Sequence, residues 1–304
     1  MSSDSNVLIL AGATASGKTE LAIELAREFN AEIVGADSRQ VYAGMPIGTA
    51  APSPQQLAEV PHHLIGFVDP FERYSAARYA SDAIRALREI RARGKRAIVT
   101  GGTGFYIRAL TGAVRLAPQY DEALRERLIR EARLHDSAFL YRWLQYHDAV
   151  RARAIDEHDT YRVLRALEIA FGARAARTPD TPVHTLASEG FRWVLIFIDE
   201  PWSTIDARIA RRTSQMLAGG LIEEAETVGD AAVAATAVGY PQACAYLRGW
   251  STADELRASL ERATRRYARR QRAWFRSEPS TLWLDRESVR AIVREKLHWC
   301  SKRD

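Results

Sequence analysis

Cysteine is scarce in this chain of 304 residues, which contains only Cys244 and Cys300. Two cysteines so far apart provide neither a disulfide framework nor the clustered thiols of a structural zinc site. The sequence also lacks an apolar run long enough to cross a bilayer, and residues 1–4 show no sign of a basic and apolar signal segment. These absences predict a cytoplasmic protein that does not enter a membrane.

Lysine is almost as rare, since only Lys18, Lys95, Lys296 and Lys302 occur, and nearly all of the positive charge is therefore arginine. The formal net charge of +5 is modest, but residues 257–276 carry eight arginines against a single acidic residue, Glu261. A general preference for arginine codons explains the overall ratio and leaves this clustering unexplained. The cluster indicates a surface for RNA, with a solvated helix face as the alternative.

Residues 12–19 match the phosphate-binding loop pattern G-x-x-x-x-G-K-[ST]. The loop follows an apolar run at residues 7–10, which predicts a buried strand, and precedes an amphipathic helix predicted at residues 21–26. Its glycines allow several backbone N–H groups to converge on one anion, and the helix N-terminus adds positive potential. We therefore predict a bound diphosphate or triphosphate, with Lys18 on the phosphate oxygens and the Thr19 hydroxyl on Mg²⁺.

Strands and helices alternate through the first hundred residues. Further strands are predicted at residues 32–35, 63–68 and 96–100, and a long helix is predicted at residues 75–93. Such alternation favours an α/β fold with a P-loop-type parallel sheet between helices. Because ligands bind at the carboxyl ends of parallel strands, the phosphate loop, Asp37-Ser38 and Gly101-Gly102-Thr103 should share one edge.

The pattern becomes helical after residue 114. Helices are predicted at residues 121–135, 136–146 and 159–171, a loop at 177–182, and a returning strand at 191–198. We therefore predict a discontinuous catalytic core, residues 1–114 and 190–304, that is interrupted by a helical domain at residues 115–189.

A phosphate loop alone is compatible with kinases, GTPases, motors and several transferases. The N-K-x-D motif of GTPases is missing, and the predicted strand at residues 96–100 leads into Gly101-Gly102-Thr103 where a motor ATPase would usually have a Mg²⁺-binding acid. The acid well placed at a strand end is Asp37. Two alternatives therefore remain: a small-molecule or nucleotide kinase, with Asp37 deprotonating the acceptor hydroxyl, and a non-catalytic RNA-binding protein that senses a nucleotide.

Several further motifs follow the loop in a fixed order: residues 37–42 (DSRQVY), 44–50 (GMPIGTA), 61–64 (PHHL), 101–106 (GGTGFY), 238–240 (VGY) and 269–276 (RRQRAWFR). Together they resemble the tRNA dimethylallyltransferase family over nearly the whole chain, from Gly12 to about Trp283. The resemblance implies that the loop holds the pyrophosphate of dimethylallyl diphosphate rather than ATP. It also implies that the acceptor is the N6 amine of the adenosine immediately 3′ of a tRNA anticodon, and we expect a monomer.

Chemistry and resemblance together assign the catalytic roles. Asp37 is the candidate base for a poorly nucleophilic amine, with a structural turn aspartate as the alternative. The resemblance implies that Thr103 bonds the oxygen between carbon and phosphorus, and that Arg125 is needed for activity, although nearby Arg127 leaves that assignment open. A solvated helix arginine is the alternative for Arg125 and for Arg212. The expected diphosphate ligands are Gly12, Ala13, Thr14, Ala15, Ser16, Gly17, Lys18, Thr19 and Arg212.

In residues 257–276 the arginines are spaced three and four residues apart. This spacing places most of their guanidinium groups on one helical stripe, which suits a phosphate backbone. The resemblance adds that residues 37–40 meet the flipped adenosine and that the helical domain grips the anticodon stem–loop. Around residues 238–240, Thr236 and Pro241 stand where relatives often carry basic residues. The expected tRNA contacts are Asp37, Ser38, Arg39, Gln40, Tyr161, Arg162, Arg165, Gly239, Tyr240, Arg269, Arg270, Gln271, Arg272, Trp274 and Arg276.

Overall fold

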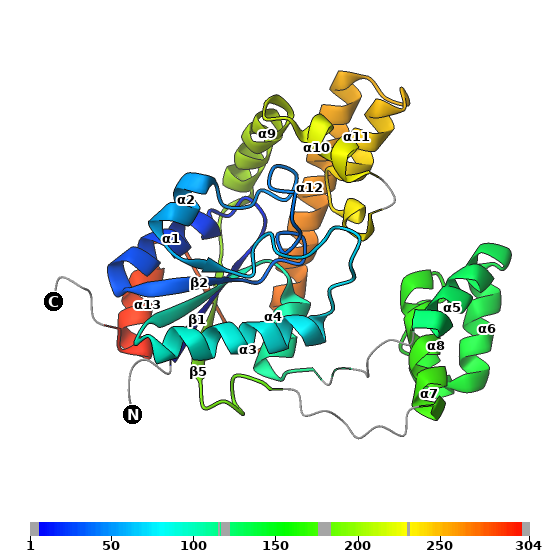
Figure 1. Ribbon diagram of the computed structural model, residues 1–304, viewed down its shortest axis with the longest axis horizontal. Coiled ribbons are helices and arrows are strands. Elements are labelled where there is room, and N and C mark those ends of the chain that lie inside the picture. Colours follow the sequence, from blue (N-terminus) through cyan, green and yellow to red (C-terminus); the bar gives the residue numbers. More distant parts are fainter. Residues whose placement is uncertain (1–5, 115, 117–121, 176–183, 230–231, 300–304) are drawn as a thin grey trace. The chain divides into compact units, whose positions relative to one another are not determined.

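The computed structural model describes residues 6–114, 116, 122–175, 184–229 and 232–299 (Figure 1). The chain divides into two compact units, one formed by Met1–Val114 with Val183–Asp304 and the other by Arg115–Pro182. We call them the core unit and the insertion unit, and describe each by itself.

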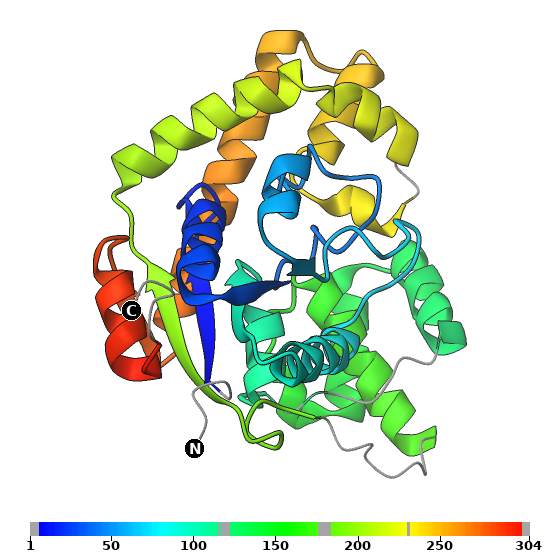
Figure 2. The same ribbon diagram turned by 60° about the vertical axis from the view of Figure 1, so that its left-hand side comes forward.

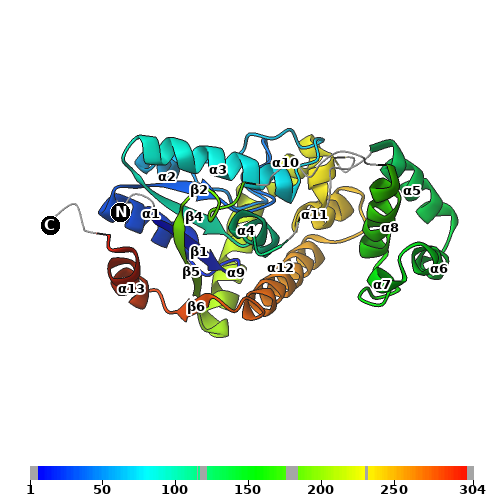
Figure 3. The same cartoon turned by 90° about the horizontal axis from the view of Figure 1, so that it is seen from below.

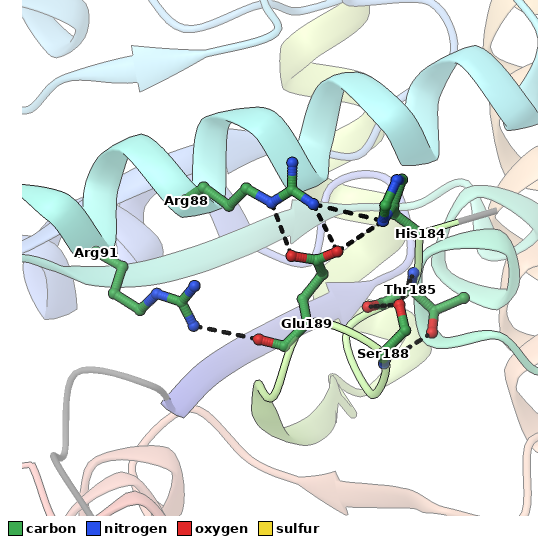
Figure 4. A network of polar contacts seen from close by, with 6 residues as sticks. All are labelled: Arg88, Arg91, His184, Thr185, Ser188 and Glu189. Carbon is green, nitrogen blue, oxygen red and sulfur yellow. Dashed lines mark hydrogen bonds and ion pairs between the residues drawn. The ribbon is translucent and has the colours of Figure 1, made fainter. Parts of the chain in front are cut away.

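The second boundary lies before His184, and not at residue 190 as the sequence suggested. Figure 4 shows why the segment from His184 to Glu189 belongs to the core unit. Arg88, on helix α3 (Ala76–Ala92), donates to the two carboxylate oxygens of Glu189 at 2.6 and 2.7 Å, and His184 Nδ1 lies 2.7 Å from the same carboxylate. Arg91 donates to the Glu189 carbonyl oxygen at 3.2 Å. The contacts of Arg88 and Arg91 join partners about a hundred residues apart, which local sequence patterns do not reveal.

Six strands form one parallel sheet in the core unit, in the order β3-β2-β4-β1-β5-β6. Leu8 on the central strand aligns with Ile98 on one side and Val194 on the other. The central strands are buried along almost their whole length, as parallel strands covered on both faces are. The strands are β1 (Asn6–Gly12), β2 (Ala31–Gly35), β3 (His62–His63), β4 (Arg96–Gly101), β5 (Arg192–Ile198) and β6 (Thr281–Leu284).

Helices cover both faces of this sheet. Figure 3 shows α3 and α13 (Ser288–Leu297) on opposite sides of it. Leu8 and Leu10 of β1 pack in one apolar cluster with residues of α13 and of α1 (Lys18–Phe29), including Leu21 and Val293. The predicted α/β fold is thereby confirmed.

The strand predicted at residues 63–68 is much shorter than expected. Strand β3 comprises only His62 and His63, because Leu64 and Gly66 both adopt left-handed backbone conformations with φ of 61°. The chain turns there, and Val68 forms an isolated parallel bridge with Tyr42.

A group of helices extends from the sheet within the core unit (Figure 2). The last of them, α12 (Ala253–Arg276), begins with a capping box in which the Thr252 hydroxyl accepts from the Glu255 N–H, and it runs back to the strand β6. The remaining core-unit helices are α2 (Pro54–Glu59), α4 (Gly104–Thr111), α9 (Trp202–Ala218), α10 (Leu221–Val228), the 3₁₀ helix η2 (Val233–Thr236) and α11 (Tyr240–Leu247).

The insertion unit is helical in its described residues and has its own apolar core, which includes Leu128, Leu140, Leu144, Val163 and Leu167. The loop predicted at residues 177–182 lies outside the described residues. Across the described parts of both units, no helix combines the length and apolar character needed to span a membrane. The helices of the insertion unit are α5 (Glu122–Leu134), α6 (Ser137–His147), α7 (Ala149–Ala152) and α8 (Thr160–Ala175).

Candidate active site

Three loops meet at the carboxyl edge of the sheet, as the sequence predicted. They follow β2, β4 and β1, which are neighbours in that order. The backbone joins them directly, since the Ala36 N–H donates to Thr100 O at 2.8 Å and the Thr103 N–H donates to Ala36 O at 3.2 Å. This edge therefore places the Asp37-Ser38 turn, Thr103 and the phosphate loop side by side.

The phosphate loop has the tight conformation that its glycines permit. Ala15 and Gly17 adopt left-handed conformations with φ of 65° and 81°, and helix α1 begins at Lys18. Gly12 has no room for a side chain, because a Cβ there would lie 2.5 Å from Ser16 Oγ. The curled backbone directs the N-terminus of α1 toward the loop, which is a favourable arrangement for an anion.

A polar pocket joins this loop to the Asp37 turn. Burial lowers the pKa of the Lys18 ammonium group, and the nearby Asp37 carboxylate opposes that shift. Burial also lowers the pKa of Arg212, whose Nη1 donates to Thr14 Oγ1 at 3.2 Å. Two cations that are poorly solvated create a strong preference for a bound anion. The residues that line the pocket are Thr14, Ala15, Gly17, Lys18, Thr19, Glu20, Asp37, Gln40, Thr49, Ala50 and Arg212.

Helix α12 completes the phosphate loop through Gln271. The Thr14 N–H donates to Gln271 Oε1 at 2.8 Å, and Gln271 Nε2 donates to Gly102 O at 3.0 Å. The side chain is buried, and a Cβ on Gly102 would lie only 2.0 Å from Gln271 Nε2. Gln271 therefore fixes two loops of the site through its amide, and its expected contact with tRNA stays a prediction.

The Asp37 turn is held from the side of β4. Thr103 Oγ1 accepts from the Ser38 N–H at 2.9 Å and donates to Ser38 Oγ at 3.3 Å, while Asp37 Oδ1 accepts from the Arg39 N–H at 3.0 Å. Sequence reasoning missed Tyr267, whose pKa is raised by burial and by the nearby Asp37 charge. Its position four residues before Gln271 on α12 is the signal that could have found it.

The arginines of α12 do not form one solvent-facing stripe. Arg265 contacts Asp206 of α9 at 3.2 Å, and Arg272 contacts Asp199, just after β5, at 2.5 Å. Trp274 packs on Gly104, where a Cβ would lie 2.1 Å from the indole ring. These three side chains attach α12 to the core, so Arg272 and Trp274 are half-buried, and their expected contact with RNA stays a prediction.

A separate set of arginines on α12 does face solvent. Within the described chain these side chains form no ion pair, although Arg269 lies 5.7 Å from the Trp202 ring and Arg276 lies 5.9 Å from the Trp283 ring. Their guanidinium groups are therefore available to an anionic partner. We call this set the arginine face; it comprises Arg262, Arg266, Arg269, Arg270 and Arg276.

Gly239 and Tyr240, which were expected to contact tRNA, are buried in this structure. The Tyr240 hydroxyl donates to Glu224 Oε1 at 2.7 Å and joins α11 to α10, whereas the Gly239 N–H donates to Gln242 Oε1 at 2.9 Å and caps α11. Their contact with tRNA stays a prediction.

The remaining predicted site residues lie in the insertion unit. Tyr161 and Arg162 are exposed at the start of α8, as an RNA contact requires. Arg125 and Arg165 are half-buried and donate to Glu168 at 2.8 and 2.9 Å. Both guanidinium groups are thus oriented by one buried carboxylate.

Comparisons with family models and with known proteins agree on one family. Two family models match, described as IPP transferase over residues 40–278 and isopentenyl transferase over residues 5–65. A tRNA dimethylallyltransferase of Geobacter sulfurreducens is 39% identical over 288 residues, covering 93% of each chain. One from Anaeromyxobacter dehalogenans is 42% identical over 284 residues, covering 91% of this chain and 94% of the relative.

A solved structure extends the match to the fold. The full-length tRNA isopentenylpyrophosphate transferase of Bacillus halodurans aligns with a TM-score of 0.69 at 32% identity, over 97% of each chain. The sequence left two alternatives open, a kinase and a non-catalytic RNA-binding protein, and these matches support neither. With its phosphate loop, its strand-end aspartate and this similarity along nearly its whole length, the chain belongs to the tRNA dimethylallyltransferase family.

Proposed function

We propose that the polar pocket is where this chain carries out the reaction of its family, the transfer of a dimethylallyl group from dimethylallyl diphosphate to tRNA. The acceptor is the N6 amine of the adenosine immediately 3′ of the anticodon, and pyrophosphate is released. The observation that carries this assignment is that Lys18, Arg212 and Asp37 line one and the same pocket.

The cationic residues of the pocket and Asp37 have complementary tasks. An exocyclic adenine amine is a weak nucleophile, so a carboxylate that accepts its proton during attack on the allylic carbon lowers the barrier. Asp37 is that base. As the carbon–oxygen bond breaks, negative charge grows on the pyrophosphate, and Lys18, Arg212 and the loop N–H groups stabilise it. Thr103, which now bonds Ser38, is proposed to contact the bridging oxygen when the diphosphate is bound.

The residues of the pocket suit Mg²⁺. This ion prefers oxygen ligands and often keeps several waters, with a few protein oxygens and the substrate phosphates completing its shell. The Thr19 hydroxyl lines the pocket beside Glu20 and Asp37, although no group of three or more His, Cys, Asp or Glu side chains forms a metal cluster in the described chain. Thr19 together with the diphosphate would hold the ion, which would add positive charge next to the leaving group.

We propose that tRNA binds through both units. The arginine face of α12 would contact the phosphate backbone, and Tyr161 and Arg162 would meet the anticodon stem–loop. Arg125, which donates to Glu168, is proposed to be needed for activity, as the resemblance to the family implies. Ser38, Arg39 and Gln40 follow Asp37 and would contact the flipped adenosine, which costs little to extrude because it lies in a loop. A cytoplasmic monomer is sufficient for these roles.

The decisive experiment is mass spectrometry of nucleosides from tRNA that has been incubated with the protein, Mg²⁺ and dimethylallyl diphosphate. We expect one five-carbon unit on adenosine. The Asp37→Asn variant should lower kcat by at least about 100-fold, because a general base typically contributes a factor of 10² to 10⁴, with tRNA affinity almost unchanged. Unmodified adenosine with the wild-type protein would refute the activity, and near-normal turnover of the variant would refute the role of Asp37.

A further inference from the structure

The segment Met45–Ala50 contributes two residues to the lining of the polar pocket, and a helix far along the chain holds this segment in place. Its last two residues, Thr49 and Ala50, line the pocket. Gln40 Nε2 donates to the carbonyl oxygens of both, at 3.2 and 2.9 Å. An amide nitrogen has two hydrogens, so these two bonds fix the direction of the Gln40 carboxamide. We call this segment the pocket wall.

The middle of the pocket wall is held by a buried carboxylate. Glu224, on α10, accepts from the Ile47 N–H at 2.9 Å and from the Gly48 N–H at 2.7 Å, each with a different oxygen. The Tyr240 hydroxyl donates to one of the same oxygens at 2.7 Å. Three hydrogen bonds converge on this carboxylate, and bonds of this charge-assisted kind are stronger than bonds between neutral groups.

Packing reinforces the same contact. The Tyr240 ring lies directly on Gly48, where a Cβ would come within 2.6 Å of the ring. Tyr240 is fully buried and Glu224 is 9% exposed, so the cluster has little access to solvent. The motifs at residues 44–50 and 238–240 are thus two sides of one contact, and Glu224 joins them.

We propose that Glu224, with Tyr240, is a positioning residue for the active site, an inference that rests on the proposed function of the pocket. Glu224 does not line the pocket. By fixing the N–H groups of Ile47 and Gly48 it sets the pocket wall, and through that wall it holds Gln40, which lines the pocket. A buried carboxylate is needed because the three groups that converge on it are all donors, and a neutral amide would place its NH₂ against one of them.

Two variants test this role, and one variant controls for a loss of stability. Glu224→Gln retains size but replaces one acceptor by a donor, whereas Tyr240→Phe keeps the ring on Gly48 and removes one hydrogen bond. Glu32→Gln is the matched control, because Glu32 is also buried and bonded, to Arg93 at 2.6 Å and His63 at 2.8 Å, but it does not line the pocket. All assays are run well below the Tm of each variant.

The measurements are kcat and KM for dimethylallyl diphosphate with the full chain, and the Kd of inorganic pyrophosphate by calorimetry without tRNA. We expect Glu224→Gln to raise KM and the pyrophosphate Kd at least tenfold, Tyr240→Phe to raise them two- to fourfold, and Glu32→Gln to leave them within twofold of wild type while lowering Tm. If Glu224→Gln behaves like Glu32→Gln, the positioning role is wrong. Since wild-type turnover is recorded in the same series, failure of the proposed function would be visible separately.

Discussion

The arginine face of α12 gives a quantitative prediction about tRNA affinity. Replacing Arg266, Arg269 and Arg270 together by glutamine removes three exposed guanidinium groups that form no ion pair in the described chain. Each phosphate contact releases counterions, so the slope of log Kobs against log salt should change by about 0.7 per contact on single-stranded RNA and about 0.9 on a duplex. The triple variant should therefore bind tRNA with a slope shallower by about 2 to 3.

A matched control separates this effect from a change in net charge. The triple variant Arg27→Gln, Arg85→Gln, Arg294→Gln loses the same formal charge, but these exposed arginines lie on other helices and are paired with Glu59, Asp82 and Glu28. We expect its salt slope to remain within about 0.5 of wild type, because few counterions are released at ion-paired sites.

The assay is fluorescence anisotropy of labelled tRNA titrated with protein at several salt concentrations between 50 and 300 mM. Circular dichroism of each variant checks that α12 is intact. An unchanged slope in the α12 variant, or an equal decrease in the control, would refute the assignment of this face to the phosphate backbone.

Three further predictions concern the core unit. Because burial lowers the pKa of Lys18, the charged form of this side chain opposes folding at neutral pH. Lys18→Met should therefore raise Tm at pH 7 and abolish pyrophosphate binding. The gain in Tm should shrink toward pH 10, where the wild-type lysine loses its charge. Gln271→Leu should weaken pyrophosphate binding in calorimetry because the Thr14 N–H and Gly102 carbonyl lose their partner, and an unchanged Kd would contradict this. Arg88 lowers the pKa of Glu189 to about 2, so the stabilisation from this pair is present above pH 4.5 and lost as pH falls toward 2. Urea unfolding should therefore show the stability deficit of Arg88→Met shrinking over that pH range.

Much of the site could be predicted because its determinants are local. The apolar run before Gly12 and the amphipathic helix after Lys18 identify a strand, a loop and a helix, and parallel topology then places Asp37 and Thr103 at the same edge. Helical spacing likewise indicates which arginines of α12 are neighbours on the helix surface. It does not indicate which side is buried, because that depends on partners far along the chain.

Asp199 and Asp206, which turn Arg272 and Arg265 toward the core, are such partners. The contact of Glu224 with Gly48 and the return of residues 184–189 to α3 also depend on long-range packing. No periodicity in the sequence encodes these pairs. Tyr240, Gln271, Arg272 and Trp274 all belong to this class, since each was matched to a motif whose side-chain direction only the folded chain determines.

The hydrogen bond between Gln271 and Thr14 has a consequence for the synthesis of the protein. The two residues are separated by 257 positions, so the anion-binding loop emerges from the ribosome long before the side chain that completes it. A nascent chain that ends before α12 can form β1 and α1, but its Thr14 amide lacks this acceptor. Competence to bind pyrophosphate should thus be acquired late in translation, together with the helix that carries the arginine face.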